Sequence, residues 1–125
     1  VIVLDASAIL AVLLAERGAD IVASHFPEAI ASAATLAEVL SKLETRGVPS
    51  QGAYLRILAF GFGIAPVEVL HARIAAKIAL APRELDLSLG DRLCIALAIA
   101  EDCALLTSDR GIAKFQSGIP VRAFR

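Results

Sequence analysis

The chain contains few of the residues that build disulfide frameworks and zinc sites. Its 125 residues include two cysteines, two histidines, one tyrosine, and neither methionine nor tryptophan. Cys94 and Cys103 form no zinc-ligand pattern with His25 or His71. Two free thiols are typical of a reducing compartment, so we expect a cytoplasmic protein.

Long hydrophobic runs are also missing. The longest apolar segments, 8–15 and 93–100, are far shorter than the ~20 residues that a membrane span needs. No basic region precedes a hydrophobic segment near residue 1, which argues against a signal peptide. We therefore expect no membrane association.

Charge of one sign does not dominate either, because 12 basic residues face 13 acidic ones and the net charge is −1. The whole molecule is therefore no general polyanion binder. Between residues 42 and 83, however, six basic residues stand against Glu44 and Glu68 alone. The six suit solvated helix faces or the lining of a site for a phosphate-bearing substrate, and they are Lys42, Arg46, Arg56, Arg73, Lys77 and Arg83.

Apolar residues make up 58% of the chain and charged residues 20%, which is typical of a globular protein. The length favours a single domain over residues 1–125 with one core. Short apolar segments predict strands at 1–4, 28–32, 64–67, 104–107 and 121–124. Helical patterns cover 6–16, 19–26, 35–46, 51–60, 68–80, 91–102 and 110–115, with a loop at 82–90. This alternation predicts an α/β fold with a parallel sheet and helices on both faces.

Four acidic residues lie at the edges of these apolar segments. Asp5 and Asp109 follow predicted strands, Asp91 opens a helix, and Glu38 lies in the first turn of another. Sites in open parallel sheets form beyond the carboxyl ends of the strands, so the four carboxylates can meet at one rim. Carboxylates gathered there repel each other unless a cation binds, which suggests a site for Mg²⁺ or Mn²⁺.

Each acid also has a local interpretation. Asp5 and Asp91 suit helix caps, and Asp109 suits a turn. Thr35 to Glu38 matches a capping box, and Glu38 can pair with Lys42 one helical turn on. Only the joint pattern favours a shared site.

Four motifs, taken in order, make the chain similar to a known family. They are Val3-Leu4-Asp5-Ala6-Ser7-Ala8, Leu36-Ala37-Glu38-Val39, Leu87-Ser88-Leu89-Gly90-Asp91-Arg92-Leu93-Cys94 and Leu106-Thr107-Ser108-Asp109-Arg110. Over nearly its full length the chain resembles PIN-domain proteins, and more specifically the VapC toxins of toxin–antitoxin pairs. The resemblance implies an α/β/α sandwich around a central parallel sheet.

The resemblance also implies a function: a metal-dependent endoribonuclease that hydrolyses RNA phosphodiester bonds and acts as a toxin. It implies that Asp5, Glu38, Asp91 and Asp109 hold one or two Mg²⁺ or Mn²⁺ ions, with support from the hydroxyls of Ser7 and Thr107. A homodimer and a cognate antitoxin are the expected partners. Two ions ~3.5–4 Å apart can activate a water and stabilise the leaving oxygen, so no histidine base is required.

Arg92 and Arg110 flank two of the acids and suit either contacts to substrate phosphates or surface ion pairs. Other functions stay open at this point. A nuclease of RNA processing outside any toxin–antitoxin pair would carry the same residues, and a non-catalytic PIN-fold interaction module would keep the fold. A receiver-type domain fits less well, because Asp5 has no acidic neighbour and Lys114 is the one late lysine.

Overall fold

Five short strands form one parallel sheet in the computed structural model, which describes residues 1–125. Their order across the sheet is β3-β2-β1-β4-β5, and in the centre Val3 pairs with Ile30 on one side and Leu105 on the other. The predicted α/β fold class is therefore confirmed. The strands are β1 (Ile2–Leu4), β2 (Ala29–Ser32), β3 (Gly63–Ala65), β4 (Ala104–Thr107) and β5 (Val121–Ala123).

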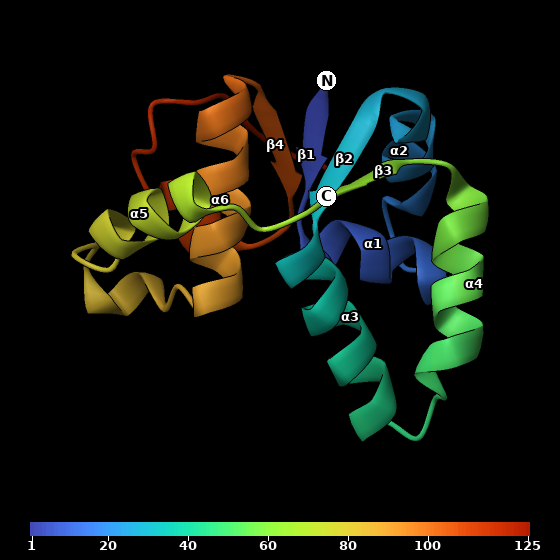
Figure 1. Ribbon diagram of the computed structural model, residues 1–125. Helices are drawn as coiled ribbons and strands as arrows, with labels where there is room; N and C mark the ends of the chain where they lie inside the picture. The colour runs from blue at the N-terminus through green and yellow to red at the C-terminus, as the bar shows by residue number, and fades with distance from the viewer.

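Helices cover both faces of the sheet (Figure 1). Side chains alternate along β1, so Ile2 and Leu4 pack into the core beneath α1 to α4, while Val3 packs against α5 to α7. The helices are α1 (Ala6–Leu13), α2 (Ala19–Ser24), α3 (Ala33–Thr45), α4 (Ser50–Phe60), α5 (Val69–Ile78), α6 (Leu89–Glu101) and α7 (Arg110–Lys114).

The strand order reverses direction between β1 and β4. The chain builds β1, β2 and β3 outward on one side, then crosses over to place β4 and β5 on the other. In open α/β sheets, the carboxyl ends of the two strands at such a reversal border a crevice. Asp5 follows β1 directly and Asp109 follows β4 after one intervening residue, so both lie at this crevice.

Several of the predicted element boundaries were wrong, and α1 and α2 end at Leu13 and Ser24, before the predicted residues 16 and 26. Glu28 ends a 3₁₀ turn (Phe26–Glu28) and does not start a strand, because Pro27 favours the turn. The third strand begins at Gly63 and ends at Ala65, and Val67 is exposed. The predicted loop 82–90 contains a 3₁₀ turn (Arg83–Leu85) and the start of α6, which Ser88 caps.

Both cysteines are free thiols, as expected. Cys94 is buried in α6, whereas Cys103 lies just beyond the end of that helix. None of the helices combines the length and the apolar character needed to cross a bilayer.

Candidate active site

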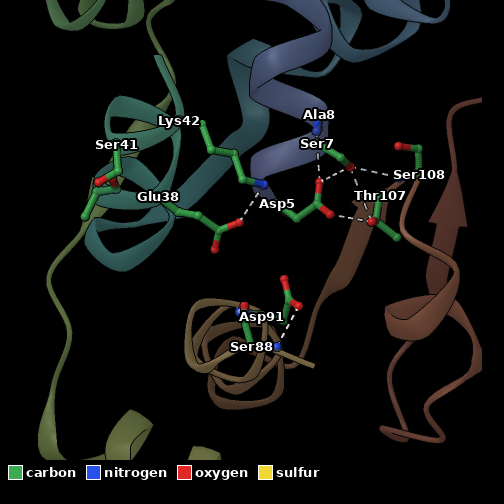
Figure 2. Close-up of polar contacts among 11 residues, drawn as sticks. Asp5, Ser7, Ala8, Glu38, Ser41, Lys42, Ser88, Asp91, Thr107 and Ser108 are labelled. Atoms are coloured by element: carbon green, nitrogen blue, oxygen red, sulfur yellow. Dashed lines mark hydrogen bonds and ion pairs between the residues drawn. The ribbon is translucent and has the colours of Figure 1, made fainter. Parts of the chain in front are cut away.

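A cleft of about 680 Å³ opens at the carboxyl edge of the sheet, where β1 and β4 end. All four acids singled out in the sequence line it, each supplied by a different segment of the chain. A fifth carboxylate, that of Asp86, lines it too, while Lys42 is the one basic residue in its wall. In Figure 2 the carboxylates of Glu38 and Asp91 face a common space, and the Asp5 carboxylate lies beside it, turned toward Ser7 and Thr107.

Asp5 is the most enclosed of these acids, with 4% of its surface exposed. Its Oδ1 accepts hydrogen bonds from the Ala8 backbone N–H at 2.9 Å and the Ser7 hydroxyl at 2.6 Å. Its Oδ2 accepts a hydrogen bond from the Thr107 hydroxyl. The predicted N-cap role is thus confirmed for Asp5, because the bond from Ala8 closes the first turn of α1.

The hydroxyls of Ser7 and Thr107 join the two loops that border the crevice. Ser7 Oγ accepts the Ser108 N–H at 3.0 Å, and Thr107 Oγ1 accepts the Asp109 N–H at 2.8 Å. Both hydroxyls then donate to Asp5. The side chains of Ser7 and Thr107 therefore link the position of Asp109 to that of Asp5. Figure 2 shows the bonds among Asp5, Ser7, Thr107 and Ser108.

Asp91 and Asp109 each cap a helix with one carboxylate oxygen. Asp91 Oδ2 accepts the Ser88 N–H at 2.9 Å while Ser88 Oγ accepts the Asp91 N–H at 3.0 Å, which makes a capping box. Asp109 Oδ1 accepts the Ile112 N–H at 2.9 Å and caps α7. Capping and cleft lining therefore occur together in the same residues, and the two interpretations are not alternatives.

The capping box predicted for Thr35 and Glu38 was wrong. Helix α3 begins two residues earlier, with Ser32 as its cap, so Thr35 is buried inside the helix. Glu38 consequently lies in the second turn and reaches into the cleft. The predicted ion pair is present, with Lys42 Nζ 3.2 Å from Glu38 Oε2 (Figure 2).

The other oxygen of Glu38 lies against the first turn of α6. A Cβ placed on Gly90 would overlap Glu38 Oε1, so only glycine at this position lets the carboxylate approach the helix. The sequence pattern gave no reason to single out Gly90, since a glycine one residue inside a helix N-terminus is common in loops as well. Its role becomes visible only from the packing of α3 against α6.

Burial and crowding of like charges weaken the acids in this cleft. Loss of solvent raises the pKa of Asp5 to about 6, against the lowering effect of its three hydrogen bonds, and the nearby Asp109 charge raises it further. Burial also raises the pKa of Asp91, and the charges of Glu38 and Asp109 add to the rise. The cleft therefore holds more negative charge than its surroundings stabilise, which favours a bound cation.

The donor set fits a hydrated divalent cation. Glu38 Oε1, Asp91 Oδ1 and Asp109 Oδ2 accept no hydrogen bond from the protein, so each keeps an oxygen for another partner. No three acidic, histidine or cysteine side chains stand close enough to enclose an ion directly. Mg²⁺ normally keeps several waters and binds through one or two carboxylates, so the spacing suits contacts made partly through water.

The two arginines from the sequence motifs lie apart from this cleft. Arg92 Nη1 donates to the Ala75 carbonyl at 3.2 Å and so links α6 to α5. Arg110 is exposed at the start of α7 and forms no ion pair. Neither residue lines the acidic cleft.

Gly111 is a second glycine that sequence analysis missed. A Cβ on it would overlap the Leu85 carbonyl oxygen, so α7 and the 3₁₀ turn at Arg83–Leu85 approach each other backbone to backbone. This contact sets Asp86, directly after the turn, beside the helix that Asp109 caps. No local sequence signal marks such a long-range approach.

Fold and cleft together define a class: an α/β/α domain with a parallel sheet and an acidic crevice at the reversal of strand order. Residues 2–117 match the PIN domain family. The chain therefore belongs to the PIN domain family, as its motifs suggested. No curated protein matches it.

Solved structures share this fold at low sequence identity. A chain of a toxin–antitoxin complex from Klebsiella pneumoniae is 18% identical, with a TM-score of 0.75 over 100% of this chain and 98% of that one. A chain of DNA-bound VapBC from Salmonella typhimurium is 15% identical, with a TM-score of 0.77 over 99% and 98%. A chain of FitAcB from Neisseria gonorrhoeae is 20% identical, with a TM-score of 0.68 over 97% and 96%.

Proposed function

We propose that this PIN-domain protein is a metal-dependent endoribonuclease and the toxin of a toxin–antitoxin pair. The observation that carries the proposal is the convergence of Asp5, Glu38, Asp91 and Asp109 from four separate segments on one cleft. Membership of the PIN domain family supports nuclease chemistry at this cleft. The solved neighbours support the toxin assignment, because the Klebsiella structure is named a toxin–antitoxin complex and the Salmonella structure is named VapBC.

The residues of the cleft would have different roles in binding the ion and in positioning its ligands. Asp91, Asp109 and Glu38 offer one free oxygen each toward a Mg²⁺ or Mn²⁺ ion, directly or through its waters. Asp5, fixed by three hydrogen bonds, supplies a rigid carboxylate at the back of the cleft. The hydroxyls of Ser7 and Thr107 fix Asp5 relative to the backbone of Ser108 and Asp109. The bound ion would supply an activated water and neutralise charge on the phosphate oxygens.

The proposal extends to the partners. The Klebsiella structure, named a toxin–antitoxin complex, supports a cognate antitoxin for this chain. The two free thiols support a cytoplasmic location. Helix α4 exposes Tyr54, Leu55 and Leu58 in a row of apolar side chains that a partner would cover. A homodimer is part of the proposal too, with Val69 and Leu70 of α5 as exposed apolar side chains that a second copy would cover, and light scattering of the purified protein would detect it.

The function is tested by cleavage of a panel of end-labelled RNAs by the purified, antitoxin-free protein. We expect cutting with Mg²⁺ or Mn²⁺, none with EDTA, and a loss of at least about 100-fold in Asp91→Asn, which keeps the capping box but removes a charge. Asp102→Asn is the matched control, because Asp102 is an exposed carboxylate at the other end of α6, in a left-handed conformation that asparagine tolerates. Cleavage that survives EDTA, or that is equal in both variants, would contradict the proposal.

A further inference from the structure

A second cavity, of about 220 Å³, opens next to the acidic cleft between the end of α5 and the start of α6. Figure 1 shows these two helices side by side, and they are in contact. Two arginines line the cavity, Arg83 from the 3₁₀ turn and Arg92 from α6, together with Asp86 and a wall of small and apolar side chains. The wall consists of Ile78, Ala79, Ala81, Pro82 and Leu87.

The two guanidinium groups have no carboxylate partner. The three ion pairs of the protein involve Glu28, Glu38 and Glu16, and none includes Arg83 or Arg92. Arg92 is held in place because its Nη1 donates to the Ala75 carbonyl, which leaves the other N–H groups of its guanidinium available. Arginines kept free of carboxylates beside a cavity are suited to bidentate recognition of phosphate.

The cavity adjoins the proposed active site. Asp86 lines both the acidic cleft and the arginine cavity, so the two hollows meet at this residue. The charge changes sign across that boundary, from five carboxylates and one lysine to two arginines and the shared Asp86. A strand lying across both would place one phosphate near the carboxylates and their cation, and another near the arginines.

We infer that Arg83 and Arg92 form a subsite for one backbone phosphate of the RNA strand, next to the phosphodiester held in the acidic cleft. The inference rests on the proposed ribonuclease function for the identity of the strand. It gives Arg92 a role that the sequence motif suggested, although through a separate cavity and not through the cleft itself. The subsite contributes positioning and affinity, because phosphate contacts fix the register of a strand without reading its bases.

The test is binding of a fluorescein-labelled single-stranded RNA of about 12 nucleotides and random sequence, measured by anisotropy with Mg²⁺. The protein carries Asp91→Asn in every case, so that the probe is not cut. Adding Arg83→Ala should weaken binding about 5- to 10-fold and lower the slope of log affinity against log salt by about 0.7, the loss of one phosphate contact. Arg83 is exposed, so its removal leaves the fold intact.

Arg17→Ala is the control, since Arg17 is an exposed arginine in the loop after α1, which lines neither cavity. Arg92→Gln removes the second charge and should weaken binding in the same way, and its thermal melt is compared with that of the parent because the bond from Nη1 to the Ala75 carbonyl is lost as well. Equal affinity and salt slope in Arg83→Ala and Arg17→Ala would overturn the subsite. Binding that depends on Arg83 in a protein that cuts no RNA would retain the subsite and overturn the ribonuclease.

Discussion

Asp5 has an unusual position for a carboxylate, because it is buried yet forms no ion pair. Its pKa of about 6 means that the folded protein holds the Asp5 proton more tightly than the unfolded chain does. Folding therefore gains stability from this group at low pH and loses it as the pH rises through 6. The burial of Asp91 acts in the same direction.

The pH dependence of unfolding tests this balance in EDTA-treated protein. Relative to Asp5→Asn, the wild type should lose roughly 2 kcal/mol of unfolding free energy between about pH 4.5 and about pH 7.5, as measured by urea denaturation. Saturating Mg²⁺ should reverse the difference at the higher pH, because the cation favours the ionised carboxylate. If the unfolding free energies of the wild type and Asp5→Asn changed with pH in parallel, ionisation of Asp5 would not destabilise the folded protein.

Thr107 carries two hydrogen bonds on one hydroxyl, accepting from the Asp109 N–H and donating to Asp5. Thr107→Val keeps the shape and removes both bonds, so we expect a loss of about 2–3 kcal/mol in unfolding free energy. Thr45→Val is the control, because the exposed Thr45 hydroxyl donates only to the Lys42 carbonyl within its own helix. Similar losses in the two variants would indicate that the hydroxyls of the crevice do not join its loops.

The approach of the Glu38 carboxylate to α6 depends on Gly90. Gly90→Ala should raise helix stability by up to about 1 kcal/mol, as alanine generally does in a helix. Its methyl group must nevertheless displace the Glu38 carboxylate. We therefore expect an unchanged or higher melting temperature together with a roughly 10-fold loss of RNA cleavage, equivalent to about 1.4 kcal/mol.

Gly52→Ala gives the matched control for this prediction. Gly52 lies in α4, and a Cβ there meets nothing within 4 Å. The same substitution should therefore stabilise α4 and leave cleavage unchanged. If Gly90→Ala also left RNA cleavage unchanged while raising stability, the position of the Glu38 carboxylate against α6 would not matter for cleavage.

A side chain is tolerated less well at Gly111 than at Gly90, because the atom facing Gly111 belongs to the backbone of Leu85. Gly111→Ala must shift a main-chain segment, so we expect a loss of about 1–3 kcal/mol in unfolding free energy, measured by urea denaturation. A gain in stability like that expected for Gly52→Ala would mean that the turn moves freely, and with it Asp86.

The elements were predictable where one local signal decided them. Continuous apolar segments such as Val1 to Leu4 mark strands buried on both faces. The partly exposed edge strands β3 and β5 were also found in the sheet. Helix starts were harder to place, because Ser32 and Ser88 cap their helices while Thr35 and Asp91 also match cap patterns. The choice between competing caps depends on tertiary packing, which a single turn of sequence does not record.

In the candidate site, too, features set by local sequence were predictable and features set by tertiary packing were not. The meeting of the four acids could be predicted from their places at strand and helix ends, and all four line one cleft, while their metal-binding role came from the resemblance and stays a prediction. Asp86, Gly90 and Gly111 could not, because their roles depend on the approach of segments far apart in the chain. The arginine cavity is of the same kind, since Arg83 and Arg92 meet only after α5 and α6 have packed.

Over the whole molecule, opposite charges are kept apart more than they are paired. The net charge is −1, yet the acids gather in one cleft and two free arginines stand in the next. Burial is the main reason that the pKa of Asp5 and of Asp91 is raised, and the like charges gathered in the cleft raise both pKa values further. Functional sites commonly contain groups with shifted pKa values. Here a bound cation would neutralise the carboxylates of the cleft, and the phosphates of a strand would neutralise the two arginines.

Binding of Mn²⁺ to the purified protein, followed by the electron paramagnetic resonance of the free ion, tests the central claim most directly. At about pH 7.5 the wild type and Asp102→Asn should bind Mn²⁺ alike, whereas Asp91→Asn and Asp109→Asn should each lose at least about 10-fold in affinity, as loss of a carboxylate ligand predicts. Equal Mn²⁺ affinity in all four proteins would contradict a cation site formed by the carboxylates of the cleft.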